Sequence, residues 1–394
     1  MANDMHTDVL VFGGGVAGLW LLGRLRRAGY AALLLESARL GEGQTRFAQG
    51  IIHGGTKYAL QGALTPSAKA VAEMPARWRA CLAGDGDPDL RGVQVLSQHH
   101  YLWSSGSLAA RMSGFLASHA MRARSRPLAG DQRPAVFRHA AFRGQVYELD
   151  EPVIDSASLV RTLAEPLAPC IRQLPGTWHL RAGSDGVILE TEQGGGAAIH
   201  AQAAVLSAGA GNAALLARLG RPEPQMQRRG LHMVLARGPL PEVFAHRLGR
   251  GATPRVTITT HPGADGDAVW YVGGQLAEEG VGRSRDAQIE AARGELRELL
   301  PWVDLAATRW TTLSIDRAEP RQPGGARPVD GFAQWDRRVV TVWPTKLALA
   351  PLVAERVLHL LGAQDVRPRA CGTAPAWPRP GYAPPPWDED LSWS

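Results

Sequence analysis

The sequence predicts an α/β protein with two domains, one Rossmann-like on a parallel sheet and one of α+β type on a mixed or antiparallel sheet. Three observations carry this prediction. A glycine motif lies between an apolar strand and a helix near residue 13, and a second turn of small residues follows a strand near residue 208. A strand-rich block with one helix fills residues 226–308. The chain has 394 residues, which is long for one hydrophobic core.

The first element is a strand–turn–helix–strand segment. Residues 9–12 form a short apolar strand, a GxGxxG motif follows, and leucines at helical spacing lead to a second strand that ends at Glu36. Gly13 permits the tight turn, Gly15 lets a pyrophosphate approach the backbone, and Gly18 lets the helix pack on the strand. The helix N-terminus offers amides to the phosphates, and Glu36 stands where a carboxylate binds ribose hydroxyls. The segment therefore predicts a dinucleotide site.

Two later segments suit a long dinucleotide. Residues 41–55, GEGQTRFAQGIIHGG, are rich in glycine and include Gln44 and Thr45. Residues 201–215, AQAAVLSAGAGNAAL, give an apolar strand, a small-residue turn at 208–211 and the start of a helix. A turn of this kind brings backbone close to a cofactor. The alternative is a plain strand–helix turn, and both FAD and NAD use such sites.

The order of these segments resembles that of FAD-linked oxidoreductases of the D-amino-acid-oxidase superfamily. The glycine motif, IHGGTKY, VLSAGAGN and PTKLALAP occur in the same order there. Within the superfamily the chain is most similar to FAD-dependent glycerol-3-phosphate dehydrogenase, whose IHGG-x-Arg-Tyr segment lies beside the flavin. His53, Gly54, Gly55 and Tyr58 match that segment, and Lys57 replaces its arginine. The resemblance covers most of residues 8–362.

Weaker matches extend the resemblance. RRGLHMVL is similar to the family's Lys-Gly-x-His strand and places His232 on its histidine, and DRAEPR echoes an Arg-Pro pair through Arg317 or Arg321. WPTKLAL resembles a Gly-Gly-Lys-Leu-Thr turn and places Lys346 on the family lysine, although bulkier residues precede it here. The resemblance implies FAD, held mainly without a covalent bond. The expected cofactor contacts are Gly13, Gly15, Val16, Ala17, Gly18, Glu36, Ser37, Gln44, Thr45, Gly50, Ile51, His53, Gly54, Ala208, Gly209, Gly211, Thr345, Lys346 and Leu347.

The resemblance also implies hydride transfer from a small anionic hydroxy compound, a hydroxy acid or polyol phosphate, to flavin N5. His53 is a candidate base because imidazole titrates near working pH; otherwise it orients the flavin or links to it covalently. His232 is the rival base, or else a satisfied histidine on a buried strand. Tyr58 hydrogen-bonds the substrate or only packs. An amine or amino-acid oxidase of the same fold and a flavoprotein subunit that needs a partner are the alternatives.

Three cations complete the expected site. Only three of the 43 basic residues are lysines, and Lys57 stands where the family has arginine, so we expect it to bind the substrate anion as a point charge. Arg317 or Arg321 supplies a guanidinium from the other side. Lys346, at the start of a helix, stabilises the reduced flavin, or is an ordinary surface lysine.

Family members interleave their two domains, and the local signals here agree. Five local signals set the boundaries: a strand at 92–103, a helix at 107–124, a helix cap at Asp155 or Ser156, a hairpin around 184–186 and a helix over 285–299. The expected FAD-binding domain comprises 1–82, 150–225 and 309–365, the substrate domain comprises 83–149 and 226–308, and a proline-rich tail covers 366–394. Tryptophans of the tail are expected to pack on the protein itself or to touch a membrane interface.

Composition argues against other classes. The net charge is +6, but basic residues are scattered, so we expect no nucleic-acid partner. Three cysteines without a CxxC motif predict neither disulfides nor a metal site and indicate a reducing compartment. We expect no signal peptide and no transmembrane segment, and a cytoplasmic location with peripheral contact at the inner membrane face left open. Oxygen, a quinone and a protein are all open as the electron acceptor.

Overall fold

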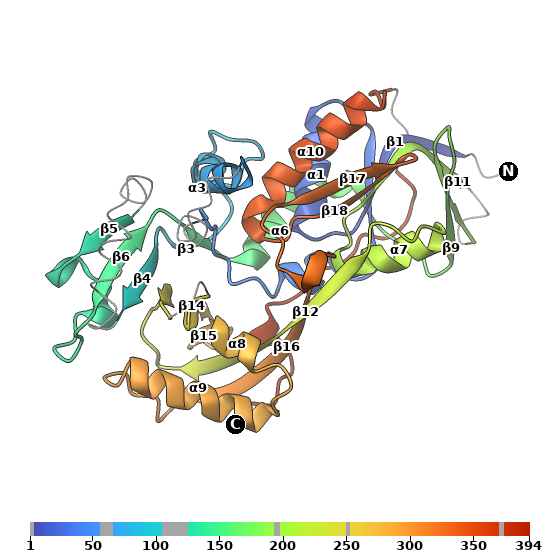
Figure 1. Ribbon diagram of the computed structural model, residues 1–394. Coiled ribbons are helices and arrows are strands. Elements are labelled where there is room, and N and C mark those ends of the chain that lie inside the picture. Colours follow the sequence, from blue (N-terminus) through green and yellow to red (C-terminus); the bar gives the residue numbers. More distant parts are fainter. Residues whose placement is uncertain (1–3, 56–65, 105–124, 193–197, 250–252, 370–373) are drawn as a thin grey trace.

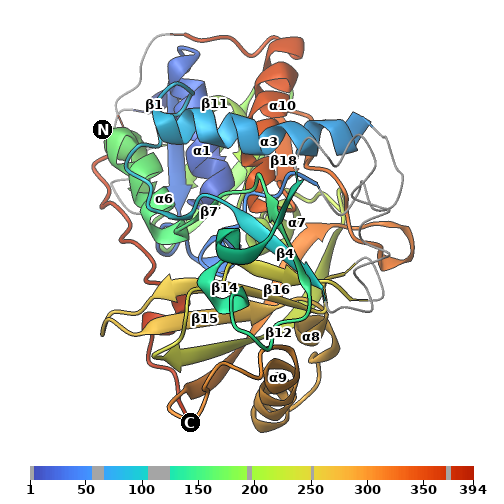
Figure 2. The same ribbon diagram turned by 90° about the vertical axis from the view of Figure 1, so that its left-hand side faces the viewer.

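The computed structural model describes residues 4–55, 66–104, 125–192, 198–249, 253–369 and 374–394. Two large β-sheets, each covered by helices, form its two halves (Figure 1). Figure 2 shows the strands of the second sheet below the helices that cover the first. This mixed α/β architecture confirms the predicted fold class. No helix in the described ranges is long and apolar enough to cross a membrane.

The first sheet is built around β1 (Met5–Phe12), which lies parallel to β2 (Ala32–Glu36) on one side and to β11 (Ala198–Leu206) on the other. Phe12 is in register with Leu35 and Leu206, so the carboxyl ends of all three strands meet at one edge. The further strands are β8 (Ile171–Gln173), β18 (Val339–Trp343), β17 (Phe332–Asp336) and the predicted hairpin of β9 (Trp178–Ala182) and β10 (Val187–Thr191).

Both faces of this sheet are buried, which explains why residues 9–12 of β1 are all apolar. Val9 and Val11 pack into the core under the helices, whereas Leu10 and Phe12 pack into a second core with β9 and β10. Asp155 caps one of the covering helices, because its carboxylate accepts a hydrogen bond from the Ser158 amide (2.6 Å). The helices on the two faces are α1 (Val16–Arg27), α3 (Pro66–Ala83), α6 (Ser156–Ala164), α7 (Asn212–Arg218) and α10 (Ala350–Ala363).

The second sheet is mixed, with mostly antiparallel pairs. Its spatial order is β16 (Arg309–Pro320), β12 (Met226–Gly238), β15 (Ala268–Gly273), β14 (Val256–Pro262), β13 (Ala245–Arg247), β4 (His100–Ser104), β6 (Gln145–Leu149) and β5 (Ser125–Leu128). Val234 and Ala236 face a core that includes residues of α9 (Arg285–Leu299), and Leu231, Met233 and Leu235 face the opposite side. The predicted helix over 285–299 is confirmed, and α8 (Gln275–Glu279) precedes it.

Two segment assignments differ from the expectation. Residues 309–320, expected in the FAD-binding domain, form β16 and pair with β12 along twelve registered positions from Met226↔Pro320 to Arg237↔Arg309. The expected single strand at 92–103 is two strands in different sheets, because β3 (Val95–Ser97) pairs with β7 (Val153–Ile154) while β4 joins the second sheet. The helix expected at 107–124 lies outside the described residues.

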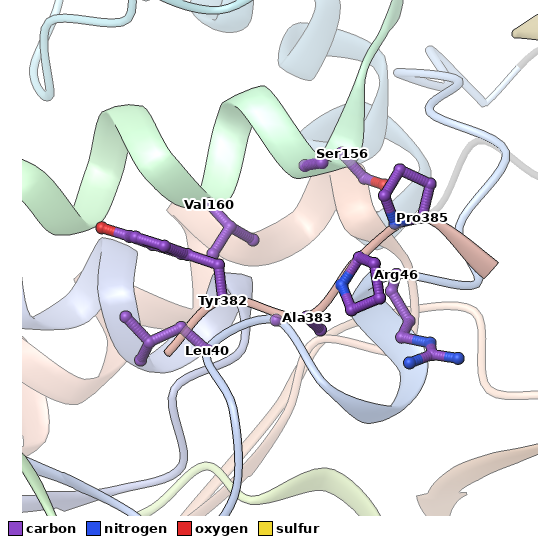
Figure 3. A pocket seen from close by; sticks show the side chains of 10 residues that line it. Leu40, Arg46, Ser156, Val160, Tyr382, Ala383 and Pro385 are labelled. Atoms are coloured by element: carbon purple, nitrogen blue, oxygen red, sulfur yellow. The ribbon is translucent and has the colours of Figure 1, made fainter. Parts of the chain in front are cut away.

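The described part of the tail packs on both halves of the protein. Backbone hydrogen bonds join Leu40 to Gly381 and Ala383 (2.7 and 2.9 Å), and Figure 3 shows this part of the tail between Leu40 and α6, at a small pocket beside Arg46. Further on, Trp387 is 2% exposed, and its ring lies 4.4 Å from that of His261 on β14. Burial against the protein itself, one of the two expectations for these tryptophans, therefore holds for Trp387.

Candidate flavin and substrate site

The glycine motif forms a turn with no space for side chains. Gly13 has a φ of +106°, and a Cβ there would lie 2.6 Å from the Cα of Ala208. A Cβ on Gly18 would lie 1.9 Å from the carbonyl oxygen of Gly13. Helix α1 begins at Val16 with Gly15 as its N-cap, and the Val16 amide donates to Thr45 Oγ1 (3.1 Å). The backbone amides of this turn and of the start of α1 suit a pyrophosphate.

Glu36 lies at the carboxyl end of β2, against the same turn. One carboxylate oxygen accepts a hydrogen bond from the Gly14 amide (2.6 Å), and the other accepts one from the Ala38 amide (2.8 Å). Ser37 is exposed beside it, with its hydroxyl 3.4 Å from the carboxylate. These bonds fix the carboxylate where the ribose of a dinucleotide bound to the turn would lie.

The second small-residue turn meets the first. Ala208 contacts Gly13, and the Ala208 amide donates to the side chain of Asn212 (2.8 Å), whose own amide donates to the carbonyl of Val342 (2.9 Å). Gly209 has a φ of +57°, and its Cβ would lie 3.5 Å from Oε1 of Gln44. Two glycine-lined turns and the 41–45 segment therefore converge, and the residues present fit a long dinucleotide such as FAD.

Residues 50–54 run from this region toward the second sheet. Gly50 has a φ of +74° and passes so close to Ile154 that a Cβ would lie 2.0 Å from its carbonyl oxygen, while Ile51 bridges to Val153. Next along the chain, the ring of His53 stacks at 5.6 Å on that of His246 in β13. His53 therefore lies between the two halves of the molecule. Lys57 and Tyr58 lie outside the described residues, so their expected roles stay predictions.

His53 also contacts a carboxylate that the sequence did not single out. Nδ1 of His53 lies 3.3 Å from one oxygen of Glu151, and the Gly54 amide donates to the other (2.8 Å). The side chain of Glu151 is 4% exposed and that of His53 is 32% exposed. Burial acts to raise the pKa of Glu151, but the His53 hydrogen bond, the charges of His53 and His100, and the Gly54 amide lower it to about 2. Glu151 is therefore ionised at neutral pH.

The structure places the rival base elsewhere. Nδ1 of His232 lies 3.1 Å from the carbonyl oxygen of Gly280, and its backbone carbonyl accepts from Gln288 of α9 (2.7 Å). His232 alternates along β12 with Met233, which faces Gly273 and Gln49 on the opposite side of the sheet. Its described contacts are those of a satisfied histidine in a buried strand, the second of the two interpretations offered above.

The two candidate arginines, Arg317 and Arg321, have different surroundings. Arg321 bonds to the side chain and the carbonyl of Gln225 at the end of the sheet. Half-buried Arg317 has no hydrogen bond or ion pair among the described residues, although Arg229 is its registered partner on β12. Burial first, then the charges of Arg229 and Arg327, lower the pKa of Arg317 to about 10. Next to it, the Ala318 amide donates to Gln44 (3.0 Å), so Arg317 lies beside the cofactor segment.

Lys346 lies where the first sheet leads into α10. It caps a 3₁₀ turn (Leu347–Leu349), and the helix expected to open at Lys346 begins at Ala350. Thr345 has a φ of +61°, and its hydroxyl donates to the carbonyl of Asp330 (3.0 Å). A left-handed threonine here replaces the small residue of the resembling family, and the half-buried Lys346 keeps its predicted role as a proposal.

Comparisons with known proteins agree with this geometry. Residues 8–360 match the family model DAO, described as FAD dependent oxidoreductase. A Pseudomonas aeruginosa protein named "Probable FAD-dependent oxidoreductase" is 50% identical over 390 residues, covering 98% of this chain and 99% of its own. A crystal structure of an FAD dependent oxidoreductase from that species has a TM-score of 0.85 at 45% identity and covers 98% of this chain and 99% of its own.

More distant structures share the fold alone. Glycine oxidase from Geobacillus kaustophilus has a TM-score of 0.65 at 17% identity and covers 95% of this chain and 98% of its own. L-alpha-glycerophosphate oxidase from Mycoplasma pneumoniae, solved with FAD bound, has a TM-score of 0.64 at 14% identity and covers 96% and 98%. A glycine oxidase and a glycerophosphate oxidase thus have nearly equal TM-scores with this chain, so the fold alone does not select the substrate.

Proposed function

The chain belongs to the DAO family of FAD-dependent oxidoreductases, and on that premise we propose that it oxidises a small anionic hydroxy compound, a hydroxy acid or polyol phosphate. Its cofactor is FAD. We propose that the cofactor is held without a covalent bond. The Gly13 and Ala208 turns, Glu36 and the 44–54 segment would hold it, and bound FAD supplies the acceptor for a hydride from the substrate carbon.

The observation that carries the proposal is the arginine pair of the second sheet. Arg229 and Arg317 are directly opposite on antiparallel strands, an arrangement that is destabilising for like charges. Arg229 is paired with Glu319 (3.3 Å) and Arg327 with Glu278, whereas Arg317 has no ion pair of its own among the described residues and, of the carboxylates, feels only the charge of Glu319, which Arg229 already engages. A half-buried guanidinium with no ion pair of its own in the described part of the chain, beside the cofactor segment, suits a carboxylate or phosphate of the substrate.

His53 supports a hydroxy compound over an amine. Oxidation of an alcohol requires a group that accepts the hydroxyl proton, whereas a neutral amine gives up a hydride without a strong base. His53 is exposed enough to meet substrate and has an ionised carboxylate at its other side, which stabilises the imidazolium that proton transfer creates. Lys57, if it lies nearby as its place in the IHGG segment predicts, would add a second cation for the same anion.

The test is an anaerobic screen for loss of the yellow colour of oxidised flavin. The compounds are D- and L-lactate, glycolate and sn-glycerol 3-phosphate, compared with glycine, D-alanine and uncharged glycerol. We expect bleaching by one of the anionic hydroxy compounds. Bleaching by an amino acid alone would support the amine oxidase, and no bleaching by any compound would support a subunit that needs a partner.

Arg317→Met then tests the anion site, with Arg321→Met as the matched control. Removing one partner of a buried charge pair costs about 2–5 kcal/mol, so kcat/KM for the anionic substrate should fall at least about 30-fold in Arg317→Met only. Lost FAD in Arg317→Met would instead place this guanidinium on the cofactor phosphates. Acid precipitation of the wild-type protein should release yellow FAD into the supernatant, and colour retained in the pellet would show a covalent link.

A further inference from the structure

We propose that Glu151 is a positioning residue that fixes the tautomer and the protonation of His53, with His246 and His100 completing a buried group around it. This inference rests on the proposed role of His53. Glu151 lies just before β7, 98 residues from His53 in sequence, and its two oxygens bind His53 Nδ1 (3.3 Å) and the Gly54 amide (2.8 Å). One carboxylate therefore binds both the His53 ring and the backbone of the IHGG segment.

The contact selects one tautomer of His53. An ionised carboxylate only accepts hydrogen bonds, so the hydrogen of neutral His53 must be on Nδ1, where it is donated to Glu151. Nε2 is then left with a lone pair. His53 is the one partly exposed ring of this group, with His100 and His246 at 0% and 4% exposure, so we assign its Nε2 to the substrate.

Two further histidines hold the ring plane. His246 stacks on His53 with an interplanar angle of 11°, and its own Nδ1 lies 2.8 Å from the hydroxyl of Thr257. The ring of His100 lies 4.1 Å from that of His246 on its neighbouring strand. Asp150, which precedes Glu151 in the chain, pairs with Arg79 of α3 (2.7 Å). The described residues contain no group of three histidines, cysteines or carboxylates placed to bind a metal ion.

The proton balance follows from this geometry. Nε2 of His53 would accept the proton of the substrate hydroxyl, bound FAD would supply the acceptor for the hydride of the same carbon, and the Nδ1 hydrogen would stay between His53 and Glu151. The imidazolium so formed is offset by the carboxylate, which keeps the buried group close to neutral during the reaction. The proton leaves through the exposed side of His53 when the product has gone.

The experiment titrates His53 in the FAD-loaded full chain labelled with ¹³C at histidine Cε1, and His53→Asn identifies its signal. An opposite charge within about 4–6 Å typically shifts a titration by about 1–3 units. In Glu151→Gln, which still accepts from Gly54 but carries no charge, the His53 midpoint should fall by about that amount. Asp150→Asn, the matched control for a neighbouring carboxylate paired elsewhere, should leave it unchanged.

An unchanged His53 midpoint in Glu151→Gln overturns the inference. If that variant does not retain FAD, Glu151→Asp decides the question, because its shorter carboxylate should move the midpoint in the same direction by a smaller amount, and no movement again overturns it. The result is separable from the proposed function. Normal flavin reduction in His53→Asn would refute the base, while the titration would still show whether Glu151 controls the ring.

Discussion

The dinucleotide turn and the proton and anion groups that we propose beside it are built on opposite principles. The turn uses backbone within one strand–helix–strand unit, where Gly13, Gly18 and Glu36 lie within 24 residues and touch one another or their neighbours. The proposed substrate side uses charged side chains brought from distant segments, as in His53 with Glu151 and Arg229 with Arg317. A site made of backbone can be identified in a sequence, because its spacing is local, whereas a site made of ion pairs depends on the tertiary fold.

The two sheets also differ in what they bury. In the described residues, every histidine with less than one tenth of its surface exposed belongs to the second sheet: His100, His232, His246 and His261. Those of the first half, such as His179, are at least partly exposed. Function and stability should therefore respond to steric change in the half built on the first sheet, here called the cofactor half, and to charge and pH in the half built on the second sheet, here called the substrate half. The predictions below test that contrast, from the largest effect to the smallest.

Gly18→Ala should abolish FAD binding. Its Cβ would lie 1.9 Å from the Gly13 carbonyl, a backbone atom that cannot move without opening the turn. Gly23→Ala on the same helix is the control, because its Cβ would make an ordinary contact at 3.6 Å and alanine favours helix. Absorbance of the purified proteins measures the FAD content, and equal content in both variants would contradict the steric account.

His53→Asn should slow flavin reduction by about 10²–10⁴-fold while FAD content stays normal, since it removes the proposed general base and no part of the phosphate turn. Anaerobic stopped-flow reduction by the substrate found in the screen measures the effect. His179→Asn, an exposed histidine of β9, should behave as wild type. If His53→Asn chiefly loses FAD, His53 belongs to the cofactor half instead.

Most of the cofactor half could be predicted from the sequence because turns and apolar periodicity are local features. It predicted α9, which the structure confirms, and it predicted the glycine motif, Glu36 and the second turn, which the structure brings together. It singled out His53 through a family motif, and the role of His53 stays a prediction. It could not find Glu151, because a lone glutamate before a short strand has no distinguishing pattern. It also assigned β16 to the wrong half, since a long strand does not show which sheet it joins. Lys57 and Tyr58 stay predictions.

Trp387→Ala should destabilise the protein by about 3–5 kcal/mol, the usual cost of emptying a large buried site. The ring packs on His261 and Tyr271 beneath the second sheet, and its nitrogen donates to the Pro262 carbonyl (3.2 Å). Trp377→Ala, which removes a partly buried tail tryptophan packed on the first half, is the control and should cost less. Urea unfolding measures both, and equal losses would show that the tail does not favour the second sheet.

His261 should make stability fall in mild acid. Burial lowers its folded-state pKa to about 3, whereas an unfolded histidine titrates near about 6.5. Below about pH 6.5 the unfolded state therefore binds a proton that the folded state does not, and stability falls by about 1.4 kcal/mol per pH unit until the folded pKa is reached.

His261→Gln can keep the 2.9 Å contact with the Thr259 hydroxyl but cannot titrate. From pH 6.5 to 5.5 its free energy of unfolding should fall about 1 kcal/mol less than that of wild type, whereas His179→Gln, from the exposed hairpin of the first half, should follow wild type. If His261→Gln and wild type lose stability in parallel, the buried histidines of the second sheet do not carry its pH dependence, and the contrast between the two halves is steric alone.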